Sequence, residues 1–223
     1  MAGWYTEGMM WQIGMVNPES EGLIILAQIL GLGLGVILHE VSHGYVALKL
    51  GDPTAKFAGR LTLNPIKHID LWGTIILPLL LVISRAGFVI GWAKPVPVNY
   101  YNLKYGKYGP VLVALSGPVT NFVILTISAL LARFSPADTA LPMLFITVAV
   151  INGVLMMFNL VPVPPLDGSK VLYLFLEKRP DVMRMLEQYG MFIILALLLF
   201  GQGFFSRVVF EPAWQLTRTI AGF

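Results

Sequence analysis

The sequence contains no cysteine and few charged residues, and these two shortages exclude several classes of protein. Of the 223 residues, 12% are charged, whereas soluble globular domains carry roughly 25%. Without cysteine there is no disulfide framework, no thiolate metal site and no cysteine nucleophile. Any metal or acid–base chemistry therefore has to use three histidines and twelve Asp and Glu residues.

Apolar residues, in contrast, are abundant. Hydrophobic side chains make up 57% of the sequence and the mean hydropathy is +0.76, which excludes a disordered chain. The composition is typical of an integral membrane protein. A net charge of +3 is too small to favour nucleic acid as a partner. We therefore expect the partner surface to be the lipid bilayer.

The apolar residues are concentrated in runs long enough to cross a bilayer. A helix needs about 20 consecutive apolar residues to span the hydrocarbon core. Four runs are of this kind, and they occupy residues 22–50, 110–133, 141–163 and 186–205. A shorter run at 72–91 is interrupted by Pro78, and residues 55–63 alternate weakly, which predicts a short hairpin or strand.

The strongest chemical signal is an HExxH motif in the first run, formed by His39, Glu40 and His43. Residues four apart share one face of a helix, so both imidazoles can reach one metal ion. Glu40 borders that face and can take a proton from water without being a ligand. Ionisable groups inside an apolar run are functional by default; a polar cluster without metal is the alternative. Gly31 and Gly35 precede His39 at steps of four residues and so lie near the same helix face. They could serve helix packing or the entry of a substrate.

A zinc site also needs a third protein ligand, and Asp167 is the better of two carboxylates that end an apolar run. Pro164 and Pro165 end the preceding helix, and Gly168 lets the backbone turn. Asp is also a common helix N-cap. The residues alone leave open whether Asp167 binds a metal or caps a helix over 168–178.

The basic residues predict the topology. Run 22–50 follows a segment without Lys or Arg and ends in a basic loop, so it should cross from the outside to the cytoplasm. Arg133, Arg207 and Arg218 then lie outside, with Arg85 near the interface. Most basic residues lie inside: Lys49, Lys56, Arg60, Lys67, Lys94, Lys104, Lys107, Lys170, Lys178, Arg179 and Arg184. We therefore expect a multi-pass protein of the cell membrane with its site towards the cytoplasm.

The same topology constrains the short run at 72–91. Asp167 reaches the two histidines only if run 141–163 also ends on the inner side. Run 72–91 must then enter and leave on one side, with Pro78 at its bend, which a protein-lined or water-filled cavity tolerates. The sequence thus predicts an all-α polytopic membrane protein with about four transmembrane helices, a re-entrant or hairpin segment and short β-hairpin-like membrane-associated strands.

Three separated motifs carry a family resemblance: HEVSH at 39–43, SGPVTN at 116–121 and NLVPVPPLDG at 159–168. They resemble motifs of the site-2 protease family of intramembrane zinc metalloproteases, peptidase family M50, and the likeness covers most of 22–205. The stretches NPIKHID and GWAKPVPVN resemble short bacterial and archaeal members. The resemblance implies a single membrane-embedded metalloprotease domain over 1–223, without PDZ or CBS domains. A regulatory partner or a second copy of the chain could then control it.

Carried over by position, the resemblance assigns roles to four residues. It makes His39, His43 and Asp167 the ligands of one zinc ion. It makes Glu40 the general base, and then the acid that protonates the leaving amine.

The resemblance also points to asparagines near the metal. It implies that Asn159 holds the substrate or the developing oxyanion and that Asn121 binds substrate, although an Asn between helices often only bonds across them. For Asn152 we expect only such a bond between helices. His68, the third histidine, lies in a basic loop, where we expect it to be solvated or to support a metal ligand rather than to be one.

The implied function is hydrolysis of peptide bonds in or near transmembrane helices of membrane-protein substrates, as in regulated intramembrane proteolysis. Such a substrate has to unwind, because helical hydrogen bonds hide its carbonyl groups. The freed backbone could then add as a strand to residues 55–63 or 94–98. The alternative from another class is a non-proteolytic membrane zinc-binding protein, a carrier or sensor that uses the same cluster without hydrolysis.

Overall fold

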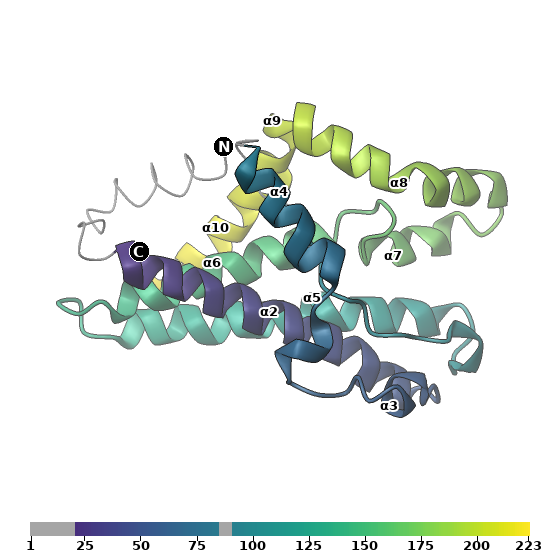
Figure 1. Cartoon of the computed structure of the whole chain (residues 1–223), viewed down its shortest axis with the longest axis horizontal. Coiled ribbons are helices and arrows are strands. Elements are labelled where there is room, and N and C mark those ends of the chain that lie inside the picture. The colour runs from purple at the N-terminus through teal and green to yellow at the C-terminus, as the bar shows by residue number, and fades with distance from the viewer. Residues whose placement is uncertain (1–20, 85–90) are drawn as a thin grey trace.

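Each of the four long apolar runs forms a helix (Figure 1). The computed structural model describes residues 21–84 and 91–223. Its long helices are α2 (Glu21–Lys49), α5 (Tyr108–Phe134), α6 (Leu141–Asn159) and α8 (Pro180–Phe200). All four are long and apolar enough to cross a membrane. The prediction of a multi-pass helical membrane protein is confirmed.

Helices α2, α5 and α6 pack against one another as the central bundle (Figure 1). Shorter helical segments connect and cover them: α3 (Thr54–Phe57), η2 (Pro65–His68), η3 (Leu71–Ile76), α4 (Leu77–Ile83), η4 (Tyr100–Asn102), α7 (Gly168–Phe175), α9 (Gln202–Phe205), η5 (Ser206–Phe210) and α10 (Glu211–Ala221). Helix α10 closes one end of the bundle, where Ala221 joins Leu125, Ala129 and Ala149 in a buried cluster.

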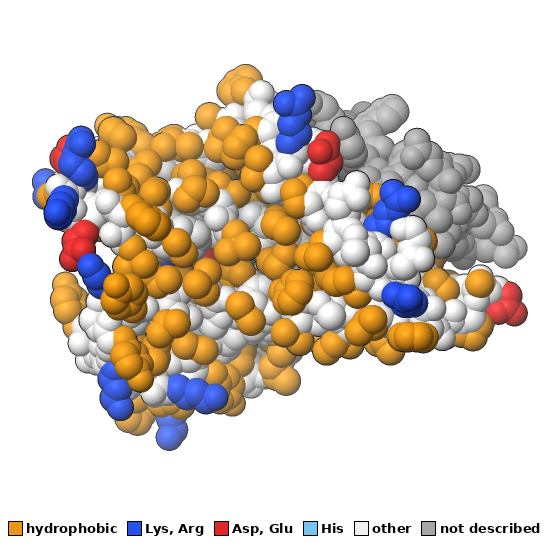
Figure 2. Space-filling model, turned by 180° about the vertical axis from the view of Figure 1, so that it is seen from behind, with side chains coloured by type: hydrophobic (Ala, Val, Ile, Leu, Met, Phe, Trp, Pro, Cys, Tyr) orange, Lys and Arg blue, Asp and Glu red, His pale blue; other side chains and the backbone are white. Residues whose placement is uncertain are grey.

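The outward faces of the bundle are apolar. Large side chains such as Ile29 and Val119 are more than half exposed. Figure 2 shows hydrophobic side chains over the middle of one face, with Lys and Arg gathered mainly at its left edge. That edge corresponds to the right of Figure 1, where α3, α7 and the start of α8 lie. An apolar belt with basic residues at one end is the pattern of a membrane protein that obeys the positive-inside rule.

The predicted re-entrant segment begins as a short apolar helix over Leu71–Ile83, which is below the length of the four spans. The chain then returns to its point of entry. Trp92 N donates to Gly73 O at 3.1 Å, and Thr74 Oγ1 donates to Trp92 O at 2.8 Å. This closure agrees with a segment that enters and leaves on one side. Residues 85–90, including Arg85, lie outside the described residues.

The bend predicted at Pro78 is wrong. The helix passes through this position, changing from the π-helical η3 to the α-helical α4, and it ends at Ile83. Pro78 lies in the first turn of α4, where a missing backbone N–H is tolerated. The described residues therefore show no reversal at the proline.

The β-hairpin predicted at 55–63 is also wrong, because the described residues contain no strand and this stretch begins in α3. Asp52 Oδ1 accepts from Thr54 N at 3.2 Å and from Thr54 Oγ1, which starts a helical turn. Gly59, with φ of +63°, ends it, and Arg60 N donates back to Ala55 O. These local bonds override the weak alternation of apolar residues.

Candidate metal centre

The two histidines of the HExxH motif lie one turn apart on α2, with ring centroids 4.6 Å apart. Gly117 of α5 faces both rings. A Cβ atom at this position would lie 2.5 Å from His39 Nε2 and 2.6 Å from His43 Cε1. The glycine of the SGPVTN motif therefore lets α5 cover the imidazoles, since any side chain would occupy their place.

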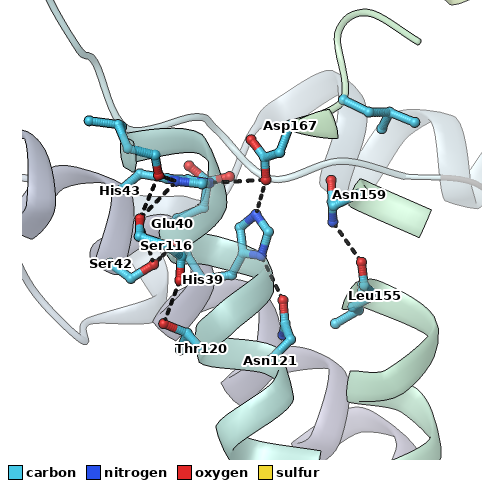
Figure 3. Close-up of polar contacts among 12 residues, drawn as sticks. His39, Glu40, Ser42, His43, Ser116, Thr120, Asn121, Leu155, Asn159 and Asp167 are labelled. Carbon is cyan, nitrogen blue, oxygen red and sulfur yellow. Dashed lines mark hydrogen bonds and ion pairs between the residues drawn. The ribbon is translucent and has the colours of Figure 1, made fainter. Parts of the chain in front are cut away.

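Asp167 reaches the same point from the loop between α6 and α7 (Figure 3). Helix α6 ends at Asn159, ahead of prolines that cannot continue it. Asp167 Oδ2 then lies 3.1 Å from His39 Nε2 and 3.4 Å from His43 Nε2. Its side chain makes no capping bond to α7. Of the two roles that the sequence left open, the geometry favours the metal ligand.

Two glycines hold the loop that carries Asp167. A Cβ atom at Gly168 would collide with Leu160 O, so the chain folds back directly on the end of α6. A Cβ atom at Gly190 of α8 would collide with Pro164 O. Close backbone contacts on both sides therefore fix the loop between α6 and α7.

The histidine rings are oriented by bonds on their far nitrogens. His39 Nδ1 lies 2.6 Å from Asn121 Oδ1, and His43 Nδ1 lies 2.8 Å from Val113 O. Both partners are acceptors, so we assign the hydrogen of each neutral ring to Nδ1. Each Nε2 then directs a lone pair towards Asp167.

These contacts make a site for a cation. One ligand atom from each of His39, His43 and Asp167 lies within 4.8 Å of the others. All three are acceptors, and Asp167 Oδ2 is buried without a hydrogen-bond donor. A buried polar atom left unpaired costs about 1–3 kcal/mol, and a metal ion would satisfy all three. Two imidazoles and a carboxylate with one position open are a typical ligand set for catalytic zinc.

Glu40 lies beside this group without belonging to it. Its Oε2 accepts the backbone N–H of Val96 at 2.8 Å. Val96 stands between Pro95 and Pro97, neither of which has an N–H. The single donor of this Pro-Val-Pro stretch therefore goes to Glu40.

The segment around Val96 is held at two further points. Lys94 N donates to His68 O at 2.9 Å, and Arg60 Nη2 donates to Lys94 O at 2.7 Å. On the other side, the fully buried Asp52 accepts from Asn99 N at 2.7 Å. The segment that positions Glu40 is thus fixed by hydrogen bonds both before and after Val96.

Asp52 is the anchor at the end of α2. Burial alone raises the pKa of its carboxyl, but hydrogen bonds from Thr54, Asn102 and Asn99 outweigh burial and hold the pKa below its usual value. Asp52 is therefore ionised at neutral pH, and charge-assisted bonds attach the 99–102 turn to α2.

The other predicted site residues differ in their surroundings. Asn121 is fully buried and bonded to His39. Asn159 is half-buried, and its Nδ2 donates to Leu155 O at 2.9 Å within α6, not to the metal-binding group (Figure 3). Of the two non-ligand roles expected for His68, the solvated one is wrong, because its side chain is buried and Nε2 bonds to Thr62 O at 2.8 Å. His68 does not belong to the metal-binding group.

Sequence reasoning did not find the groups that act through the backbone. Val113 orients His43 with its carbonyl oxygen, and Val96 orients Glu40 with its backbone N–H. Every residue type except proline carries both main-chain groups, so the sequence gives no sign of these roles. Gly117 could have been found, because it stands in the quoted SGPVTN motif at a position where only a small residue allows close helix packing.

Comparisons with known proteins give the same class. The sequence profile of peptidase family M50 matches residues 131–201. YwhC of Bacillus subtilis, which is named as a zinc metalloprotease, is 43% identical over 175 residues, 72% of this chain and 74% of YwhC. Rip2 of Mycolicibacterium smegmatis, also named so, is 27% identical over 190 residues, 82% of this chain and 71% of Rip2. No solved structure matches the chain.

The apolar bundle and its His-His-Asp group define a membrane metalloprotease with zinc as its cofactor. The 43% identity to YwhC, over more than two thirds of both chains, also identifies the family. The chain belongs to peptidase family M50.

Proposed function

We propose that the chain is an intramembrane zinc metalloprotease of the site-2 type. It would hydrolyse peptide bonds in or near the transmembrane helices of membrane-protein substrates, as in regulated intramembrane proteolysis, with residues 1–223 as one membrane-embedded domain. The observation that carries this proposal is the convergence of His39, His43 and Asp167 inside a bundle of apolar helices, with Glu40 beside them.

The ligands and the acid–base group have separate roles. His39, His43 and Asp167 would hold the ion. Zinc, when bound, activates a water molecule and polarises the scissile carbonyl. Glu40 accepts the proton of the attacking water and then donates it to the leaving amine. The bond from Val96 engages Oε2 and leaves the second carboxylate oxygen for this proton.

Two asparagines have different places in this scheme. Asn159 is the candidate for holding the substrate or the oxyanion, and its Nδ2 would exchange Leu155 O for that group. The full burial of Asn121 behind His39 supports an action through His39 over direct contact with substrate.

The 92–98 segment is the candidate surface for an unwound substrate. Alternate residues Trp92, Lys94 and Val96 donate their N–H groups into the protein, which is the pattern of an extended strand. Pro95 and Pro97 belong to the opposite edge and offer only carbonyl oxygens there. A substrate strand would therefore donate its own N–H groups to this edge.

The location of the enzyme is also a proposal. The Lys and Arg residues that gather at one end of the molecule support insertion in the cell membrane with that end in the cytoplasm (Figure 2). The metal-binding group is then reached from the cytoplasmic side, since His43 lies near the end of α2 that carries Lys49 and bonds to Val113, near the end of α5 that follows Lys107.

Metal analysis combined with a cleavage assay tests this function. We expect purified protein to hold one zinc ion and to cleave a transmembrane test substrate, with activity lost on chelation and restored by zinc. Asp167→Ala should lose the zinc, while Asp138→Ala, in the exposed turn after α5, should retain it. Zinc-loaded protein that cleaves nothing and moves zinc into vesicles would favour a carrier.

Replacing Val96 with Pro tests how Glu40 is positioned. The variant loses the N–H that holds Glu40 Oε2, and we expect cleavage to fall on the order of 10- to 100-fold, because misplacing a catalytic group by 1 Å has costs of this size. Zinc content should not change. Val96→Ala retains the N–H and is the matched control, so equal losses in the two variants would contradict the assigned role of the backbone donor.

A further inference from the structure

A chain of buried amides runs from α6 to the metal-binding group. Asn121 of α5 and Asn152 of α6 are both fully buried. Asn121 Nδ2 donates to Asn152 Oδ1 at 2.9 Å, and Asn121 Oδ1 accepts from His39 Nδ1 at 2.6 Å. Figure 3 shows Asn121 below His39, on the side away from Asp167.

The orientation of both amides is fixed by backbone carbonyls. Asn152 Nδ2 donates to Val148 O at 2.9 Å and to Gly31 O at 3.3 Å. Asn121 Nδ2 also donates to Gly35 O at 3.3 Å. Carbonyl groups only accept, so turning either amide over would set its oxygen against these carbonyl oxygens without a hydrogen between them. Asn121 Oδ1 therefore faces His39, and His39 Nδ1 has to carry the hydrogen.

The two glycines of α2 make this arrangement possible. A Cβ atom at Gly35 would lie 2.6 Å from Asn152 Oδ1, and one at Gly31 would lie 3.2 Å from Val148 Cα. Both positions are tighter than ordinary contacts, so a side chain there would push α6 away. Gly31 and Gly35 are thus packing residues that give the Asn152 amide access to α2.

We infer that Asn152 and Asn121 form a positioning relay through which α6 fixes the tautomer and orientation of His39. The inference rests on the proposed function and extends it to a residue outside the ligand set. Groups behind a metal ligand typically change metal affinity 10- to 100-fold when they are replaced. At His43 the corresponding Nδ1 is held differently, by Val113 O at 2.8 Å and by Ser116 Oγ at 3.3 Å, both of α5.

Zinc affinity of four variants tests the relay. We expect Asn121→Leu to weaken zinc binding about 10- to 100-fold and Asn152→Leu about tenfold. Asn152→Asp retains the acceptor used by Asn121 when its carboxyl is protonated and donates to Val148 O or Gly31 O in place of the amide, so its zinc affinity should fall less than that of Asn152→Leu. Thr147→Val is the matched control, because Thr147 lies on the same helix and bonds only within it, to Met143 O at 2.8 Å.

A spectroscopic readout separates positioning from general stability. The chain has only three histidines, so ¹⁵N-histidine NMR of the zinc-free protein, in which no metal fixes the tautomer, resolves each ring. We expect a hydrogen on Nδ1 of His39, and a changed ligand-field spectrum of the cobalt-substituted protein in Asn121→Leu and Asn152→Leu alone.

Three outcomes would overturn the relay: a His39 ring with its hydrogen on Nε2, unaltered zinc affinity and spectra in both Leu variants, or equal losses in Thr147→Val. The NMR result decides the matter even if a Leu variant does not fold. Unmodified protein that binds no zinc would overturn the proposed function as well, whereas normal zinc binding with unaltered variants would overturn the relay alone.

Discussion

Replacing Glu40 with Gln is expected to abolish cleavage and leave zinc bound. Gln has the size of Glu and can still accept the Val96 N–H through its amide oxygen, so the local structure should persist. It cannot act as a base, and losing a positioned general base typically costs 10²- to 10⁴-fold in rate. Cleavage rates and metal content measured on the same preparation provide the test.

A second Glu→Gln variant controls for the change in charge. Glu177 is exposed and pairs with Lys107 at 2.7 Å, away from the metal-binding group. Glu177→Gln should cleave at the rate of the unmodified protein. Zinc-loaded Glu40→Gln protein that retains full activity would contradict the assignment of Glu40, and equal zinc transport by both proteins would favour a carrier.

Much of the fold could be predicted because the bilayer restricts what apolar runs can form. A span has to satisfy its own backbone hydrogen bonds, so each long run became a helix near the expected residues. The chain near 55–63 is not restricted in this way. There the bonds of Asp52 to Thr54 and the turn at Gly59 decided the conformation, and a weak apolar alternation was a poor guide.

The metal-binding group could be predicted because its chemistry depends on side-chain type and spacing. His39 and His43 share a helix face, and Asp167 follows prolines that end a helix. The supporting groups were harder to foresee. The role of Asn152 depends on the approach of α6 to α2 at Gly35, which is a tertiary contact that a single sequence does not specify.

Gly117→Ala is expected to destroy zinc binding although Gly117 supplies no ligand. The added methyl group would lie 2.5 Å from His39 Nε2 and 2.6 Å from His43 Cε1, whereas unstrained contacts between such atoms are about 3.5–4.0 Å. The rings would have to retreat by roughly 1 Å, which exceeds the ±0.2 Å that metal–ligand distances tolerate. Zinc content and cleavage should therefore fall together, as metal analysis and the substrate assay would detect.

The control for this substitution is Gly33→Ala on α2, where an added Cβ atom meets nothing within 4 Å. Alanine in place of glycine favours a helix by about 1 kcal/mol at either position, so poor helix formation cannot account for a loss of zinc at residue 117 alone. We expect Gly33→Ala to bind zinc and cleave normally. Normal zinc content in Gly117→Ala would contradict the packing of α5 against the two imidazoles, and with it the site geometry on which the metalloprotease mechanism depends.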